Sequence, residues 1–284
     1  MAIDFKKYIM STGTHYISNS GKDENNAYHG GKAGDQTGHE WELKGWYNRP
    51  WTVILRWPDP TVGLLIAELG IAAALNNAIG YDQYQRTTYW TQLSKVGYDP
   101  SKITTACEED CTAGVTANCK AAGMLLGIKA LQDLPTSVYS GSMKSTFVKA
   151  GFQALTASKY ISKSAYLLPG DILLYEGHHA ATNVSYGSKV RPSKAPTLPA
   201  IAPAKAPATP AAPSTGAKQL IVTGASVNVR SAPGTTNKIL GIVHKSDALP
   251  YQGEDKSVSG TPWHLVEYKN QNGWISGKYS EVKA

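Results

Sequence analysis

The sequence is poor in the residues that would identify several common protein classes. It has only 3 cysteines, all between residues 107 and 119, and only 3 phenylalanines. An odd number of cysteines in one short stretch excludes a disulfide framework, and without a second pair or a nearby histidine their spacing does not fit a zinc site. We therefore expect no disulfide scaffold, no metal and no cofactor. A candidate reactive thiol remains.

Long hydrophobic runs are also absent. The longest apolar stretch, around residues 62–74, contains Glu68 and is too short to span a bilayer. The first residues, Met-Ala-Ile-Asp-Phe-Lys-Lys, lack the apolar segment of a secretory signal peptide. We therefore expect no membrane insertion. We expect synthesis in the cytoplasm, and a protein made there can still act outside if another agent opens the cell.

Acidic charge becomes scarce toward the end of the chain. Residues 1–188 hold 16 basic and 16 acidic side chains, residues 189–217 hold 4 basic and no acidic ones, and residues 218–284 hold 8 basic and 5 acidic ones. The net charge of +7 therefore belongs to the tail, which favours an anionic surface such as a wall bearing teichoic acids. No run of five Lys or Arg residues occurs, so nucleic acid is not an expected partner.

Composition divides the chain into three parts. Residues 191–217 are almost wholly Pro, Ala, Ser, Thr and Lys, which predicts an extended linker without a core. Residues 1–190 are long enough for one domain of ordinary size. Residues 218–284 hold short apolar runs separated by turn residues, which predicts a small all-β barrel.

The apolar pattern within residues 1–190 predicts an α+β fold, with helices first and strands after them. Helical spacing marks residues 61–80, 84–95 and 111–127, and we expect a turn at 128–136. Residues 1–60 are too polar for a core and too aromatic for disorder, so we expect ordered loops there. Predicted strands are Phe147–Val148, Phe152–Leu155, Ile172–Tyr175 and Ala180–Tyr186.

Cys111 stands where the third predicted helix begins. The partial positive charge and free N–H groups of a helix N-terminus lower a thiol pKa from its ordinary value of about 8.5 and can bind an oxyanion. Cys119 lies farther along the same face, so we expect it in the core. Cys107 precedes the helix and should be the more exposed of these two.

A histidine pair, His178 and His179, follows a predicted turn and opens a strand. Adjacent strand residues point to opposite faces, so only one of the two can face the thiol. A cysteine at a helix start and a histidine on a facing strand form the nucleophile and base of papain-like enzymes.

These segments resemble the NlpC-type family of papain-like cysteine peptidases, and the N-terminal block resembles that of phage endolysins of this family. Asp110–Val115 resembles the nucleophile motif D-C-S-x-x-V, Pro169–Leu173 the P-G-D strand and His179–Thr182 the histidine strand. The resemblance implies a papain-like helix-plus-antiparallel-sheet domain. It also implies that Cys111 is the nucleophile and that His179, not His178, is the base.

The third polar residue of that family is not assigned. Its usual place falls at Arg191, where the linker begins. Asn183 lies roughly 13 Å from His179 along a strand, which is too far to orient the ring. Asp35 or Gln36 could supply the orienting group or an oxyanion donor from the N-terminal loop, or either could be a turn former.

Residues 226–234 and 273–279 resemble the opening and the ending of bacterial SH3 modules, which bind peptidoglycan peptides or cross-bridges. The dipeptide Asn272-Gly273 predicts a hairpin turn, and Trp274 is expected in the core. Tyr251, Trp263 and Tyr279 could line a wall-binding groove or could pack structurally.

Together these features predict a monomeric peptidoglycan hydrolase that also binds anionic wall polymers. The resemblance implies cleavage of a γ-D-glutamyl–diamino acid bond, with an N-acetylmuramoyl-L-alanine amidase, as in the related CHAP group, as the alternative. A non-catalytic wall-binding or adhesion protein and an acyl-transfer enzyme on the same fold are further alternatives.

Overall fold

The computed structural model describes residues 3–197, 218–245, 247–268 and 271–283. Contacts between Cα atoms divide the chain into two units, with the boundary between Pro207 and Ala208. Most of the predicted linker, residues 198–217, lies outside the described residues. The two units are described separately below.

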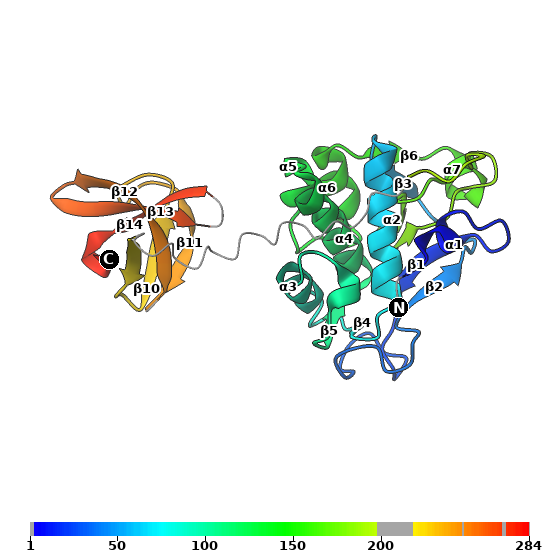
Figure 1. The fold of residues 1–284 in the computed structure, drawn as a ribbon, viewed down its shortest axis with the longest axis horizontal. Coiled ribbons are helices and arrows are strands. Elements are labelled where there is room, and N and C mark those ends of the chain that lie inside the picture. Colours follow the sequence, from blue (N-terminus) through cyan, green and yellow to red (C-terminus); the bar gives the residue numbers. More distant parts are fainter. Residues whose placement is uncertain (1–2, 198–217, 246, 269–270, 284) are drawn as a thin grey trace. The chain divides into compact units, whose positions relative to one another are not determined.

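A six-stranded antiparallel sheet forms the centre of the first unit, with the order β2-β1-β8-β7-β3-β6 (Figure 1). Strand β1 pairs with β8, so that Ser18 lies opposite Thr182, and chain segments from the two ends of the unit become neighbours. The strands are β1 (Tyr16–Ser20), β2 (Trp41–Gly45), β3 (Val53–Arg56), β6 (Gln153–Leu155), β7 (Ile172–Tyr175) and β8 (His179–Asn183).

Two long helices, α2 (Pro60–Ala74) and α4 (Cys111–Leu126), lie side by side against this sheet (Figure 1). Helix α2 is capped by Asp59, whose side chain accepts from the Thr61 N–H, and Pro60 is suited to the first helical position. Its residues 62–74 are all buried, so helix and sheet share one apolar core.

Shorter elements complete the first unit. A two-stranded parallel sheet, β4 (Ile79–Tyr81) and β5 (Cys107–Glu109), runs directly into the start of α4. The remaining helices are α1 (Phe5–Ile9), α3 (Thr88–Lys95), α5 (Lys129–Gln132), α6 (Met143–Ala150) and α7 (Ser158–Ile161), with 3-10 turns η1 (Pro100–Lys102) and η2 (Ser164–Tyr166).

The second unit is a seven-stranded antiparallel sheet with the order β11-β10-β14-β13-β12-β9-β15. Leu220, Val229, Val266 and Ile275 are fully buried in its core, and Trp274 is buried as expected. Its elements are β9 (Gln219–Val222), β10 (Ser226–Arg230), β11 (Ile239–His244), β12 (Ala248–Val258), β13 (Thr261–Tyr268), β14 (Gln271–Ser276), η3 (Gly277–Tyr279) and β15 (Ser280–Lys283).

The structure confirms the α+β class of the first unit and the all-β class of the second. It also confirms the helix at Cys111. Helix α2 begins one residue before the predicted range 61–80 and ends within it, and α3 lies within the predicted range 84–95.

Several local expectations are wrong. Residues 1–60 supply three strands of the central sheet rather than loops alone, because β1 pairs with β8, and β3 with β6 and β7, from the end of the unit. Residues 147–148 belong to helix α6, and the segment expected as a turn contains α5. The Asn272-Gly273 dipeptide lies within β14, paired with Glu267 and Val266, so it is not the turn.

Candidate active site

Cys111 is the first residue of α4, and a set of polar contacts holds the start of this helix in place. The side chain of Asp110 caps the helix by accepting from the N–H groups of Thr112 and Ala113. Arg86 in turn binds both carboxylate oxygens of Asp110, at 2.5 and 2.9 Å, and the carbonyl oxygen of Val138. The cysteine is therefore attached to a capped and anchored helix end.

His179 is the first residue of β8, and contacts on two sides fix its ring. Its Nε2 lies 2.9 Å from Oδ1 of Asn19, which also accepts a hydrogen bond of 3.1 Å from the Tyr47 hydroxyl. The indole of Trp51 stacks on the imidazole with a centroid distance of 6.0 Å. Because Oδ1 accepts, Nε2 carries the hydrogen, and in the neutral ring Nδ1 is left free to accept a proton.

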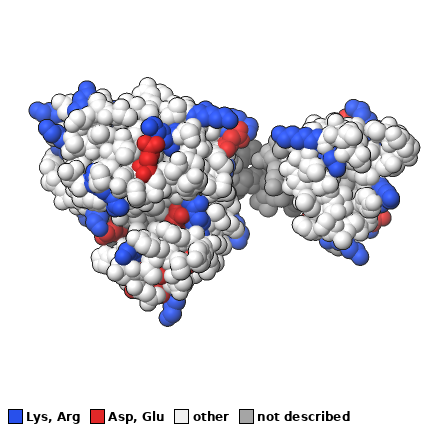
Figure 2. All heavy atoms as spheres, turned by 180° about the vertical axis from the view of Figure 1, so that it is seen from behind, with Lys and Arg blue, Asp and Glu red and all other residues white. Residues whose placement is uncertain are grey.

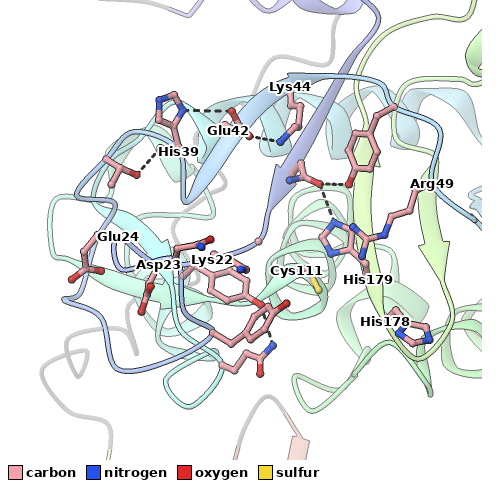
Figure 3. Close-up of a pocket in the computed structure, with 18 residues that line it drawn as sticks. Lys22, Asp23, Glu24, His39, Glu42, Lys44, Arg49, Cys111, His178 and His179 are labelled. Atoms are coloured by element: carbon pink, nitrogen blue, oxygen red, sulfur yellow. Dashed lines mark hydrogen bonds and ion pairs between the residues drawn. The ribbon is translucent and has the colours of Figure 1, made fainter.

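Cys111 and His179 line one cavity of about 630 Å³ in the first unit (Figure 3). The backbone N–H of Ala180, the residue after His179, donates to the Cys111 sulfur, so the thiol lies against the start of β8. Figure 3 shows Asp23 and Glu24 toward one end of the cavity and Arg49 toward the other, with the Cys111 sulfur and the His179 ring between them. The structure thus brings the two predicted catalytic side chains together.

The His178 side chain also lines the cavity but does not share these contacts. It is exposed in the turn before β8 and stacks on Tyr175, with ring centroids 4.2 Å apart. His179 is instead buried, with a relative exposure of 7%. The two rings of the pair are thus directed differently, and only His179 has an orienting partner from β1.

Burial favours the neutral forms of both site residues. It raises the pKa of the Cys111 thiol to about 12, with Asp110 as a second cause, while the Ala180 N–H and Arg86 act in the opposite direction. It lowers the pKa of His179 to about 4, helped by the positive charges of Arg49 and Lys44. The thiol pKa is therefore raised rather than lowered as expected from its place at the helix N-terminus, and loss of hydration is the largest cause.

The expected oxyanion donors at the helix start are only partly available. The N–H of Thr112 is already bonded to Asp110, so of these two helix-start donors only the Cys111 N–H is not used by the cap. Tyr81, at the end of β4, also lines the cavity, and its hydroxyl accepts from the Gln83 amide. Burial raises the pKa of Tyr81, and the nearby Cys111 is the second cause. The hydroxyl therefore keeps a proton that it can donate.

Asp35 and Gln36 have structural contacts within the N-terminal loop. The Asp35 carboxylate accepts from several consecutive backbone N–H groups, including those of Gly38 and Glu40. The Gln36 amide donates to the carbonyl oxygens of Ala33 and Gly34. Neither residue is among those that line the cavity, and their contacts are those of turn formers.

Asn19 is the polar partner that sequence reasoning missed. It lies on β1, which sequence analysis assigned to loops, and 160 positions separate it from His179. Asn183, rejected as a partner of His179 for its distance, instead accepts a hydrogen bond through Oδ1 from Nε2 of His15 at 2.6 Å. Residues 16–20 show no apolar–polar alternation, and the pairing of β1 with β8 is what brings Asn19 to His179.

The other two cysteines are buried away from solvent. Cys119 has no exposed surface, as expected for a core residue. Cys107 is also buried, with 1% exposure, because β5 pairs with β4 inside the unit, so its expected exposure is wrong. Burial raises the pKa of Cys107 to about 12.

A second cavity, of about 500 Å³, lies in the second unit and contains two of the three predicted wall-binding aromatics. Trp263 forms part of its wall, and Tyr279 lines it with 44% of its surface exposed. Tyr251 is not among the lining residues, and its hydroxyl bonds to Asp255 at 2.9 Å. The basic residues Arg230 and Lys278 also line this cavity.

Comparison with known families is decisive for the first unit, where the profile of the endolysin-like domain matches residues 17–190. The chain belongs to the endolysin-like domain family. The matched residues include Cys111, His179 and all six strands of the central sheet, apart from Tyr16, the first residue of β1.

The profile of the bacterial SH3 domain matches residues 225–281, within the second unit. No curated protein matches the chain. An endolysin-like domain followed by a bacterial SH3 domain indicates a cell-wall hydrolase whose second unit binds the wall. Among the described residues of this endolysin-like protein, no helix has both the length and the apolar character needed to cross a membrane.

Proposed function

We propose that the protein is a cysteine-dependent peptidoglycan endopeptidase of the NlpC type. The observation that carries this proposal is the shared cavity of Cys111 and His179, in which Asn19 holds Nε2 of the histidine. A thiol nucleophile, an imidazole base and a polar group that orients the base form the constellation of papain-like hydrolases.

The reaction begins from the neutral pair. As Cys111 Sγ attacks the carbonyl carbon of a stem-peptide amide, the thiol proton passes to Nδ1 of His179, and a C–S bond forms. The resulting oxyanion collapses, the C–N bond breaks, and His179 gives the proton to the leaving amine. Water then attacks the thioester with His179 as base, which releases the acid and restores the thiol.

Two donors are suited to the oxyanion. The candidates are the Tyr81 hydroxyl and the Cys111 backbone N–H, because both residues line the cavity and neither group takes part in the helix cap. Donors that are placed before the reaction stabilise developing charge at little reorganisation cost. The charge that forms on the imidazolium is stabilised by Asp110, which raises the pKa of His179.

The bond we propose is the amide between the γ-carboxyl of D-glutamate and a diamino acid, as the NlpC resemblance implies. The second unit would hold the enzyme on the wall through the cavity that contains Trp263 and Tyr279. Basic side chains predominate over acidic ones on the face of this unit shown in Figure 2, which suits an anionic wall polymer. We further propose synthesis in the cytoplasm of a phage host and action after release.

The test is digestion of purified, chemically defined peptidoglycan, with mass spectrometry of the released fragments. The parent should produce new D-glutamyl carboxyl ends, whereas Cys111→Ser and His179→Ala should produce none above background. Cys107→Ser is the matched control, because a hydroxyl can replace the Cys107 thiol as donor to the Ala78 carbonyl oxygen.

Two other results would each overturn the proposal. New ends at the muramoyl–L-alanine bond would identify an amidase. Full wall binding without any release of fragments would identify a binding protein.

A further inference from the structure

Two cations that line the cavity, Arg49 and Lys22, form no ion pair within the described chain, and Arg49 is the one beside His179. Arg49 lies between β2 and β3, is half-buried and lines the cavity beside His179 (Figure 3). Its guanidinium carbon lies 5.8 Å from the ring centroid of Tyr175, and no carboxylate of the described chain forms an ion pair with it. Lys44, by contrast, is paired with Glu42 at 2.8 Å.

An unpaired arginine at this place opposes the proposed chemistry in the free enzyme. Its charge disfavours the imidazolium that His179 must become during catalysis, and it is the largest electrostatic contribution to the lowered pKa of that ring. The other charged or titratable groups around the ring are Lys44 from β2, which acts in the same direction, and Asp110 with Cys111 at the start of α4. An anion bound by Arg49 would remove the main opposing charge.

The chemistry of the guanidinium identifies the anion. A planar guanidinium donates two parallel hydrogen bonds to a carboxylate, and stacking on an aromatic ring leaves its edge free to do so. In the proposed substrate, the D-glutamyl residue that provides the scissile γ-amide also carries an α-carboxylate. This carboxylate is close enough to the attacked carbon to lie beside His179.

We infer that Arg49 binds the α-carboxylate of the residue whose γ-carbonyl is attacked, and that it selects stem peptides in which this carboxylate is free rather than amidated. The inference rests on the proposed function and names its substrate class more closely. Arg49 is thus a specificity residue, and it assists His179 only when the correct substrate is bound.

The experiment compares two synthetic peptides with the full-length protein. One is L-Ala-γ-D-Glu-L-Lys with a free α-carboxylate, and the other is its α-carboxamide counterpart. The parent should prefer the carboxylate peptide. Arg49→Gln should lower kcat/KM for that peptide roughly ten- to hundred-fold, because a charged hydrogen bond is lost. It should not lower kcat/KM for the carboxamide, because the charge that opposes the His179 imidazolium is removed there.

Two further variants test whether the preference depends on the planar guanidinium and on the position of the charge. Arg49→Lys keeps the charge without the planar fork and should give an intermediate preference. Lys149→Gln removes an exposed positive charge outside the cavity and should leave the preference unchanged. An equal loss on both peptides in Arg49→Gln, or a parent that prefers the carboxamide, would overturn the inference.

Binding to the Cys111→Ser protein keeps this inference distinct from the proposed function. Calorimetry with each peptide should show the same preference for the carboxylate, and Arg49→Gln in that background should abolish it. If the parent cleaves neither peptide but this preference is found, the endopeptidase proposal fails and the role of Arg49 stands. If cleavage occurs and the binding preference is absent, the role of Arg49 fails alone.

Discussion

Asn19 Oδ1 accepts a hydrogen bond from Nε2 of His179 across 2.9 Å, although 160 positions separate the two residues in the chain. Strands β1 and β8 make this contact possible, because Ile17 lies opposite Asn183 and the side chains of Asn19 and His179 then lie on the same face of the sheet. The contact determines which ring nitrogen is available to the thiol. It therefore underlies the proposed mechanism.

Replacing Asn19 with alanine should lower kcat by roughly ten- to hundred-fold, because the ring of His179 loses its orienting acceptor and the tautomer is no longer specified. KM should change little in this variant. In Asn19→Asp, the acidic limb of the pH–rate profile should shift to higher pH, because an added negative charge favours the imidazolium and raises the pKa of His179. Steady-state kinetics from pH 4 to 9 would show both effects. Asn48→Ala, at an exposed position that does not line the cavity, is the control. Unchanged kinetics in Asn19→Ala would contradict the role of Asn19.

The resting thiol should react slowly at neutral pH. Burial raises the pKa of Cys111 to about 12 and lowers that of His179 to about 4, so neither residue is charged in the free enzyme near pH 7. The rate of alkylation by iodoacetamide should rise continuously with pH up to the alkaline range, because only the thiolate reacts. Mass spectrometry of the labelled peptide would follow Cys111, with buried Cys107 and Cys119 as internal references. A plateau of reactivity below pH 7 would instead show a preformed thiolate–imidazolium pair.

Glu68, buried in the middle of α2, should make the first unit less stable as the pH rises. Burial raises its pKa from the ordinary value of 4.5 to about 8. The folded protein then retains a proton that the unfolded chain loses, so the stability is fully present below pH 4.5 and is lost as the pH rises through 8. Glu68→Gln should match the parent at pH 4 and be more stable at pH 9 by roughly 2–4 kcal/mol.

Urea denaturation at both pH values would measure this difference. Glu176→Gln, at a partly exposed position on the surface, is the control for removal of one carboxylate. An advantage of Glu68→Gln that is the same at pH 4 and pH 9 would show that the ionisation of Glu68 is not its cause.

In the second unit, Tyr279→Ala should weaken binding to purified walls by roughly three- to thirty-fold, because an aromatic side chain in a binding cavity contributes a large contact area. Tyr279 is 44% exposed, so the variant should keep its fold. Co-sedimentation with walls would measure affinity, and circular dichroism would verify folding. Ile242→Ala removes another exposed apolar side chain, one that does not line the cavity, and should bind like the parent. Equal binding by Tyr279→Ala would exclude this cavity as the wall site.

Local sequence was sufficient for the features that depend on neighbouring residues. The helix predicted to begin at Cys111 does begin there, and the structure adds that Asp110 is its N-cap. The strands at residues 172–175 and 179–183 follow from apolar runs bounded by turn residues. The α+β class and the β nature of the second unit follow from the same short-range patterns.

Tertiary structure alone decided how the site is completed and how it is charged. Asn19, Trp51 and Arg49 come from a segment whose role depends on pairing with strands far along the chain, and pairing of this kind is not encoded in any one window. The burial of Cys107 likewise follows from its pairing with β4. The sequence placed a thiol at a helix start, but only the folded surroundings determine how much water the thiol loses. This loss of hydration raises the thiol pKa, whereas the helix start alone predicted a lowered one.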